Sequence, residues 1–188
     1  MKLAFTGLFI ALSIITVTSC DSAIKNQRLK RIDSLGTYLN HVNEVTSNID
    51  SALIEKRINN LSSIGDWVLA NITDTLAPKP GITFGDHLRC KKFYDKSRLR
   101  LMQVKTELKY SEKQLQKLRA DVENSFYSNE KFEGYFKTEA QAIGKLVNAS
   151  DELDTTYESV NAQYVSTKPK VDAIVDSIKA IIYSPEPI

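Results

Sequence analysis

An apolar stripe at alternating spacings of three and four residues runs through most of this chain and constrains its fold more than any other feature. Such spacing, sustained over many turns, is typical of helices that pack as coiled coils. No run of alternating β-branched residues interrupts it. We therefore predict an all-α protein whose seam consists of these residues: Ile32, Leu35, Leu39, Val42, Ile49, Leu53, Ile54, Ile58, Leu61, Ile64, Val68 and Ile72; Leu101, Val104, Leu108, Ser111, Leu115, Leu118 and Val122; Phe132, Phe136, Ile143, Leu146, Leu153, Tyr157, Val160, Tyr164, Val171, Ile174, Ile178 and Ile181.

Helix breakers are few and divide the stripe into three predicted helices. The first covers about 24–73, and we interpret the skip in its seam after Leu53 as a local change of winding without a break. A Pro/Gly loop over 77–85 precedes the second helix, which begins near Asp86 and ends in a polar turn over 125–129. Short connections make successive helices antiparallel, so we predict an elongated up-down-up three-helix bundle. A looser chain of coiled coils completed by self-association is the alternative.

A proline lies within the third predicted helix. Pro169 should bend that helix or begin a short fourth helix after it, over 170–183.

The first residues form a targeting segment. Lys2 precedes an apolar run over 3–17, which is typical of a secretory signal. At about 15 residues, this run is shorter than the ~20 that a membrane-spanning helix needs.

The end of this segment, Val17-Thr18-Ser19-Cys20, resembles the lipobox of bacterial lipoprotein precursors. The resemblance implies that a diacylglycerol is placed on the Cys20 sulfur, that the chain is cut before Cys20 and that the new amine is acylated, by chains such as palmitate. It also implies anchoring to a membrane of the bacterial cell envelope. Asp21 resembles a retention signal for the inner membrane in some bacteria, but that rule is not general and leaves inner or outer membrane open. An ordinary signal peptide with a chance cysteine is the alternative. The resemblance carries nothing about residues 21–188.

These observations divide the chain into four parts. We predict a signal peptide over 1–19, a lipidated N-terminus and short tether over 20–23, one helical bundle domain over 24–183 and a flexible tail over 184–188. Cys90 would then be the only cysteine left for the fold, so no internal disulfide is expected, and we interpret it as a half-buried small hydrophobe.

Catalytic and metal-binding patterns are not found in the sequence. The chain contains no glycine-rich phosphate loop, no HExxH and no CxxC, and its only histidines are His41 and His87. We therefore predict no catalytic residues, no metal site, no cofactor and no enzymatic activity.

Charge is divided unevenly between two neighbouring segments. Residues 86–120 contain eleven Lys or Arg and four acids, whereas residues 121–160 contain nine acids and three lysines. One interpretation pairs these segments across the helix seam. In the other interpretation, the most closely clustered cations are free to bind an acidic envelope protein or an anionic envelope component. Nucleic acid is not an expected partner, because an exported lipoprotein does not normally meet it. These cations are Arg89, Lys91, Lys92, Lys96, Arg98 and Arg100.

In the 77–85 loop, Phe84 is either a recognition tip or a hydrophobic plug over Trp67 and Val68.

A short motif recurs six times: Asp, then Ser or Thr, then a small apolar residue or Thr. It resembles an O-glycosylation motif of exported proteins in one group of Gram-negative bacteria. The resemblance implies sugar on solvent-exposed hydroxyls. The alternative is that these are ordinary polar steps beside the apolar seam. The hydroxyl residues are Ser22, Ser34, Ser51, Thr75, Thr155 and Ser177.

Together these features predict a lipid-anchored helical protein that acts by contact, as an interaction, scaffold or adaptor module. Its expected partners are a membrane, reached through acyl chains on Cys20, and another envelope component; self-association is the further alternative for the bundle. The alternative function is that of a periplasmic chaperone-like or sequestering protein, which would hold acidic or unfolded clients on the basic second helix.

Overall fold

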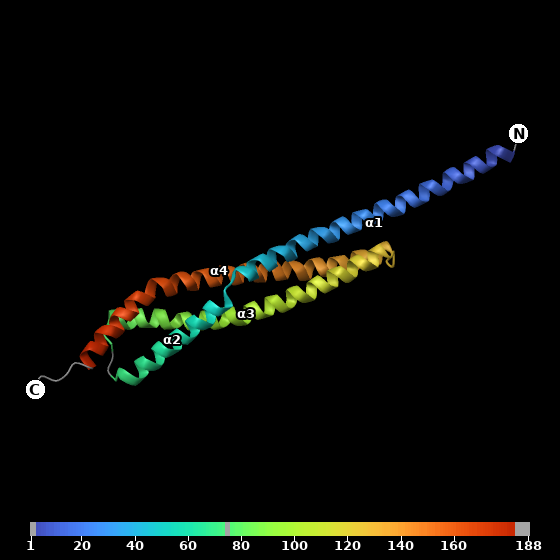
Figure 1. Ribbon diagram of the computed structural model, residues 1–188. Coiled ribbons are helices and arrows are strands. Elements are labelled where there is room, and N and C mark those ends of the chain that lie inside the picture. Colours follow the sequence, from blue (N-terminus) through green and yellow to red (C-terminus); the bar gives the residue numbers. More distant parts are fainter. Residues whose placement is uncertain (1–2, 74–75, 183–188) are drawn as a thin grey trace, which may run out of the picture. The chain divides into compact units, whose positions relative to one another are not determined.

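The chain is helical throughout the part that the structure describes. The computed structural model describes the backbone of residues 3–73 and 76–182, and the side chains of 22–73 and 76–182. It contains four helices: α1 (Leu3–Asn48), α2 (Ser51–Asn71), α3 (Pro78–Glu123) and α4 (Asn129–Ile182) (Figure 1). The predicted all-α class is confirmed, and the predicted count of three helices is not. The side chain of Cys20, residue Thr75 and the predicted tail over 184–188 lie outside the described residues.

A break at residues 49–50 separates α1 from α2, where a continuous helix was expected. Asp50 leaves the helical conformation, with φ −76° and ψ 99°, and caps α2. The side chain of Asp50 accepts a hydrogen bond from the backbone N–H of Leu53 at 2.9 Å. An Asp at this position satisfies an N–H group that otherwise has no partner in the first helical turn. The skip in the seam after Leu53 is therefore a helix start, and our interpretation of it as a change of winding was wrong.

The start of α3 lies inside the predicted Pro/Gly loop. Pro78 and Pro80 occupy the first turn of α3, and the N–H of Gly81 donates to the carbonyl of Ala77 at 3.0 Å. The first N–H groups of any helix have no intrahelical partner, so a proline there removes no hydrogen bond. The prediction of a loop over 77–85 was wrong for residues 78–85, because proline breaks a helix only beyond its first turn.

The turn between α3 and α4 lies where the polar residues 125–129 predict it. Ser125 adopts the left-handed conformation with φ 57°. The N–H of Phe126 donates to the carbonyl of Asp121 at 2.9 Å, and that of Ser125 to Val122 at 3.1 Å. These two bonds form a Schellman motif, which satisfies the last carbonyls of the helix. Ser128 then caps α4, since its carbonyl accepts from the N–H of Phe132 at 3.0 Å.

Helix α4 continues through Pro169 to Ile182. The predicted short helix after Pro169 is therefore not a separate element, and the fourth helix arises from the break at 49–50 instead. Pro169 itself is exposed to solvent.

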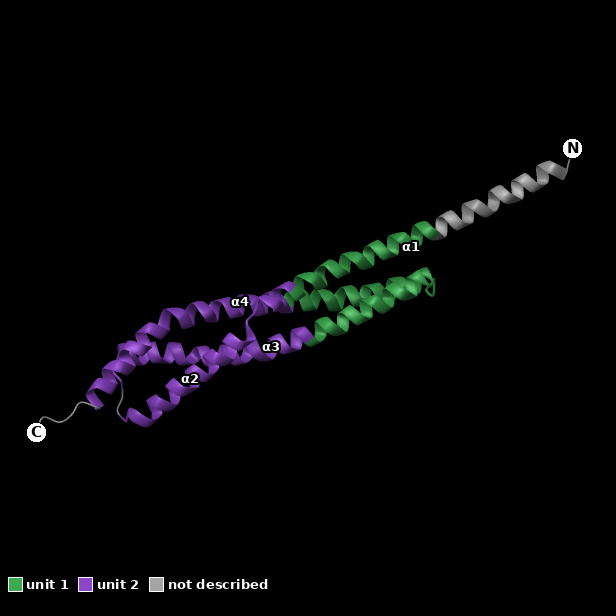
Figure 2. Cartoon of the chain, viewed as in Figure 1, with its two compact units in different colours: residues 1–43, 106–148 green, residues 44–105, 149–188 purple. Residues whose placement is uncertain are grey.

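The helices divide between two compact units (Figure 2). Unit 1 comprises residues 1–43 and 106–148, and unit 2 comprises residues 44–105 and 149–188. Unit 1 therefore combines segments of α1, α3 and α4, and unit 2 combines the end of α1, all of α2 and segments of α3 and α4. The prediction of one domain over 24–183 stays a prediction.

The predicted seam forms most of the two cores. Unit 1 buries Ile32, Leu35, Leu39, Val42, Leu108, Leu115, Leu118, Val122, Phe132, Ile143 and Leu146. Unit 2 buries Ile49, Ile54, Ile58, Leu61, Phe84, Cys90, Tyr94, Leu101, Val104, Leu153, Tyr157, Val160, Tyr164 and Val171. The predicted seam does not extend to Ile181, whose side chain is 78% exposed. No helix among the residues with described side chains has a stretch long and apolar enough to cross a membrane.

Candidate functional site

The six cations that the sequence singles out on α3 belong to unit 2 and fall into two sets. Three of them are engaged within the chain. Arg89 lies 3.3 Å from Asp86, Lys91 lies 3.3 Å from Asp95, and Arg98 lies 3.3 Å from both Glu55 and Asp95. The cross-helix partner of Arg98 is therefore on α2, and not on the acidic segment of α4 with which we expected α3 to pair.

The other three cations have no ion pair with any residue that the structure describes. Lys92, Lys96 and Arg100 are all exposed and follow one another at intervals of four residues on α3. Residues at this spacing lie on neighbouring turns of the same helix side. We call these three residues the cationic stripe. Because no acid of the described chain neutralises them, their charge is available to an external anion.

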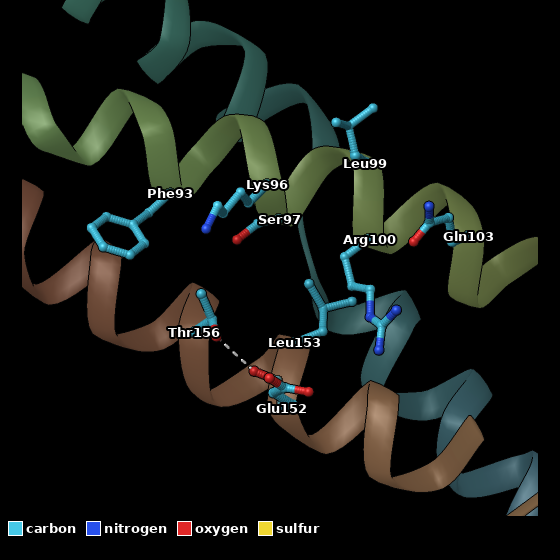
Figure 3. Close-up of a pocket in the computed structure, with 9 residues that line it drawn as sticks. All are labelled: Phe93, Lys96, Ser97, Leu99, Arg100, Gln103, Glu152, Leu153 and Thr156. Carbon is cyan, nitrogen blue, oxygen red and sulfur yellow. Dashed lines mark hydrogen bonds between the residues drawn. The ribbon is translucent and has the colours of Figure 1, made fainter. Parts of the chain in front are cut away.

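A groove of about 400 Å³ runs beside the cationic stripe, between α3 and α4 of unit 2. Figure 3 shows Phe93, Ser97 and Arg100 pointing from α3 toward α4, whereas Leu99 points away from α4. The lining of the groove consists of Phe93, Lys96, Ser97, Leu99, Arg100 and Gln103 from α3, and Glu152, Leu153 and Thr156 from α4. Two of the three stripe cations, Lys96 and Arg100, thus border a groove with an apolar component.

The inner part of the groove contains one polar group without a hydrogen-bond partner. Ser97 is 1% exposed, and its Oγ has no partner among the described residues. Leu153 of α4 is 2% exposed and also lines the groove. A buried hydroxyl without a partner costs about 1–3 kcal/mol, so such groups are rare in folded proteins.

Sequence reasoning missed Ser97 because it considered only charge and apolar character in this segment. A usable signal was present. The 3-4 spacing of the second seam extends backward from Leu101 through Ser97, Tyr94, Cys90 and His87 to Phe84. All five of these residues are buried.

A partly buried polar cluster occupies another part of unit 2 and links α2, α3 and α4. The hydroxyl of Tyr94 donates to Asn161 Oδ1 at 2.8 Å. The guanidinium of Arg57 donates to the same Oδ1 and, at 2.5 Å, to the Tyr94 hydroxyl. It also stacks 4.8 Å from the ring centroid of Tyr164, whose hydroxyl donates to Asn60 Oδ1 at 2.8 Å. Burial raises the pKa of Tyr94 to about 12, so Tyr94 stays protonated and able to donate.

His87 belongs to the same part of unit 2. Its ring is fully buried, lies 5.0 Å from the ring of Tyr164, and its Nδ1 is 2.8 Å from Thr167 Oγ1. Its Nε2 has no partner among the described residues. Burial, assisted by the charge of Lys168, lowers the pKa of His87 below its ordinary value.

Two of the predictions made for unit 2 need correction. Phe84 is 3% exposed within α3, so it is not an exposed recognition tip, and its burial agrees with the alternative of a hydrophobic plug. Cys90 is fully buried, where half-burial was expected. Burial raises the pKa of the Cys90 thiol, which keeps it in the unreactive protonated form.

The Asp-Ser/Thr motifs lie on helical surfaces wherever the structure describes them. Ser22, Ser34, Ser51, Thr155 and Ser177 are all exposed. Several hydroxyls bond to the carbonyl of the preceding turn, as Thr155 does to Asp151 at 2.9 Å and Ser177 to Ala173 at 2.8 Å. The motif at Ser51 has an evident structural role, because its Asp50 caps α2. Glycosylation of these residues stays a prediction.

Metal ligands do not gather among the described residues: no group of three or more His, Cys, Asp or Glu side chains could hold an ion there. Comparison with known proteins adds no relative, since no family model, no curated protein and no solved structure matches this chain. The site therefore has to be interpreted from its own chemistry.

Proposed function

We propose that this protein is a lipid-anchored interaction module of the bacterial cell envelope, which binds an acidic partner through the cationic stripe of α3. The observation that carries the proposal is the position of the stripe beside the groove between α3 and α4 of unit 2, which Lys96 and Arg100 line. Lys92, Lys96 and Arg100 are exposed on one side of a helix, and no acid among the described residues pairs with them. Surface cations without an internal partner favour association with an oppositely charged surface, chiefly by raising the rate of encounter.

Anchoring through Cys20 is the second part of the proposal and is supported by the lipobox-like sequence over 17–20. Two or three acyl chains would hold the protein at a membrane far more firmly than one chain. We expect the wild-type chain to partition with membranes and to incorporate labelled fatty acid. Cys20→Ser should remove the label and release the protein from the membrane fraction.

Binding without catalysis is the third part, and the contacts of the buried polar side chains support it. The Arg57 guanidinium is engaged by Tyr94 and Asn161, and the Tyr164 hydroxyl by Asn60. These partly buried side chains are engaged with each other, which stabilises a packed unit. Catalysis would instead require several polar groups that converge on a cleft.

The test is capture of crosslinked partners from the native envelope. Lys92→Glu/Lys96→Glu/Arg100→Glu should abolish recovery of a stoichiometric partner. The matched control reverses Lys105, Lys109 and Lys113, which share the helix, the four-residue spacing, the exposure and the lack of an ion pair with any described residue. That control should retain the partner. Equal recovery with both triple variants would refute the role of the stripe.

The same preparation distinguishes a chaperone-like function. A chaperone of this kind would suppress the aggregation of several unrelated unfolded proteins, and added salt would weaken the effect. An interaction module should yield one partner and give no such protection.

A further inference from the structure

We infer that the groove between α3 and α4 of unit 2 binds an amphipathic helix of a partner protein, one whose apolar stripe carries acidic residues along the edge that faces α3. This inference rests on the proposed function, because it assigns a binding mode to the same surface. Three properties of the groove carry it: its apolar lining, the free hydroxyl of Ser97 and the arrangement of charge along it.

The shape and lining of the groove suit a helix. On α3 the lining residues span Phe93 to Gln103, which is about 15 Å of helix at ~1.5 Å per residue. Phe93, which is half-buried, provides apolar surface in the same groove, and the buried Leu153 lines it from α4. A groove that follows two neighbouring helices accepts the apolar face of a third, as in other complexes where a helix lies in a hydrophobic groove.

The Ser97 hydroxyl gives the groove a polar anchoring point. A serine in a helix commonly bonds to the carbonyl four residues earlier. Ser97 makes no such bond, although it is 1% exposed and lines the groove. A serine, threonine or carboxylate side chain of the incoming helix would supply the missing partner. Ser97 therefore contributes to binding at no cost to an existing hydrogen bond of the protein.

Charge of both signs favours a polypeptide over an anionic lipid surface. Lys96 and Arg100 line the groove from α3, whereas Glu152 lines it from α4. No described residue forms an ion pair with any of these three side chains. An anionic bilayer would be attracted by the two cations and repelled by Glu152. A partner helix can present acidic residues toward α3 and a basic residue toward α4, so it can pair with all three charged side chains.

A pair of synthetic peptides tests the inference. Each has about 20 residues, long enough for appreciable helix formation in water, and carries leucines at helical spacing. One peptide has Glu along one edge of the leucine stripe, and the other has Lys at the same positions. Fluorescence anisotropy with the full chain should show salt-sensitive binding of the Glu peptide and none of the Lys peptide.

Variants of the protein then locate the binding. We expect Lys96→Glu/Arg100→Glu to weaken binding of the Glu peptide by about tenfold, equivalent to about 1.4 kcal/mol. The control Lys109→Glu/Lys113→Glu makes the same change of net charge at the same spacing on α3 and should change binding by less than about twofold. Ser97→Ala should weaken binding several-fold while leaving the thermal midpoint unchanged or higher. Equal effects of the two double variants, or no effect of Ser97→Ala on binding, would overturn the inference.

Two further measurements exclude the other occupants. Binding to vesicles that contain anionic phospholipid, in the absence of peptide binding, would overturn the helix proposal in favour of a membrane. Sedimentation that shows a dimer broken by Lys96→Glu/Arg100→Glu would assign the groove to a second copy of this chain. If the stripe reversal abolishes partner capture while neither peptide binds, the proposed function stands and the groove inference fails.

Discussion

The two units of this protein are stabilised by different kinds of interior. Among the described residues, the buried polar side chains of unit 2 are Thr46, His87, Ser97 and Ser150, whereas unit 1 buries only Ser111. Arg57 in unit 2 and Arg31 in unit 1 show the same contrast. Arg57 in unit 2 donates to two neutral side chains and stacks on Tyr164.

In unit 1 the arginines lie at the surface of the apolar core. Arg28 and Arg31 lie 4.9 Å and 5.3 Å from the ring centroid of Phe132, which is fully buried. Arg31 also pairs with Glu133 at 2.5 Å, and Arg119 pairs with Asp33. These ion pairs are exposed, and exposed pairs stabilise a protein by about 0–1 kcal/mol.

The comparison shows that helices with the same heptad pattern can pack around two kinds of interior. An apolar seam, as in unit 1, depends on burial and shape. A seam that includes a buried hydrogen-bond network, as in unit 2, depends on every donor keeping its acceptor, because an unpaired polar group in the interior is costly. The two units should therefore respond differently to mutation and to pH.

The largest effect is expected from Phe132→Ala in unit 1. Removing a fully buried aromatic side chain should lower the free energy of unfolding by about 3–5 kcal/mol, because burial is lost and a cavity remains. Native-state hydrogen exchange should show lost protection of α1 and α4 amides in unit 1. As a control, Phe126→Ala removes a side chain that is 69% exposed and should change stability by less than about 0.5 kcal/mol. Similar losses for both variants would contradict the apolar account of unit 1.

Asn161→Ala should produce the next largest effect, in unit 2. It removes the Oδ1 that accepts from the half-buried Arg57 and the buried Tyr94, and a buried donor left unsatisfied, such as the Tyr94 hydroxyl, costs about 1–3 kcal/mol. Urea denaturation would measure the loss. Its counterpart in unit 1, Glu133→Gln, weakens an exposed ion pair and should cost less than about 1 kcal/mol. If the Glu133 variant loses as much as the Asn161 variant, the contrast between the units fails.

The pH dependence should separate the units. The pKa of His87 is lowered from 6.5 by burial and by Lys168, while Asp172 opposes the shift. The unfolded state then binds more protons below pH 6.5, so unit 2 keeps the full contribution of His87 above 6.5 and loses it as the pH falls toward the lowered pKa. His87→Gln should flatten this decline.

Unit 1 should respond in a more acidic range. The hydrogen bond from Arg31 lowers the pKa of Glu133 below 4.5, so its contribution is present above pH 4.5 and is lost as the pH falls below it. Burial raises the pKa of Glu139. This shift has the opposite effect on stability, because it favours the folded state as the pH falls. Hydrogen exchange measured between pH 6.5 and 5 should therefore show loosening in unit 2 first. Loss of protection in unit 1 before unit 2 would contradict this assignment.

The smallest effect is expected at the turn of unit 1. Ser125 holds a left-handed φ of 57°, a conformation that glycine adopts without the steric cost of a Cβ. Ser125→Gly should raise the free energy of unfolding by about 0.5–1 kcal/mol, visible as a higher thermal midpoint. The same replacement at Ser34, inside α1 of the same unit, should lower stability by a similar amount, since glycine disfavours a helix interior. A gain at both positions would argue against local strain at Ser125.

Much of the fold could be predicted because it depends on local periodicity. Alternating three- and four-residue spacing needs only the geometry of one helix, so the all-α class and most of the seam follow from it. The turn over 125–129 was also predictable, as a cluster of polar residues between two apolar stripes. The roles of proline and aspartate at helix ends were harder to predict. Pro78 begins a helix and Asp50 caps one, yet both residue types also end helices, and only the position within the turn separates the two roles.

The candidate site was predictable only in part. Charge density alone identified six cations on α3, but it could not separate Arg98, which reaches Glu55 on α2, from Arg100, which has no such partner among the described residues. That distinction depends on which residues of other helices lie within ion-pairing distance. The burial of Phe84 and Ser97 likewise depends on the start of α3 and on the approach of neighbouring helices.

By itself, then, the sequence determined that the described chain is helical, where its apolar stripe runs and that its charge is concentrated on the segment that forms α3. Tertiary structure decided that the chain forms two units and which cations stay unpaired beside a groove. The physical reason is the range of the interactions. Helix formation and capping are settled within a few residues, whereas ion pairs, burial and grooves are made by residues far apart in the chain.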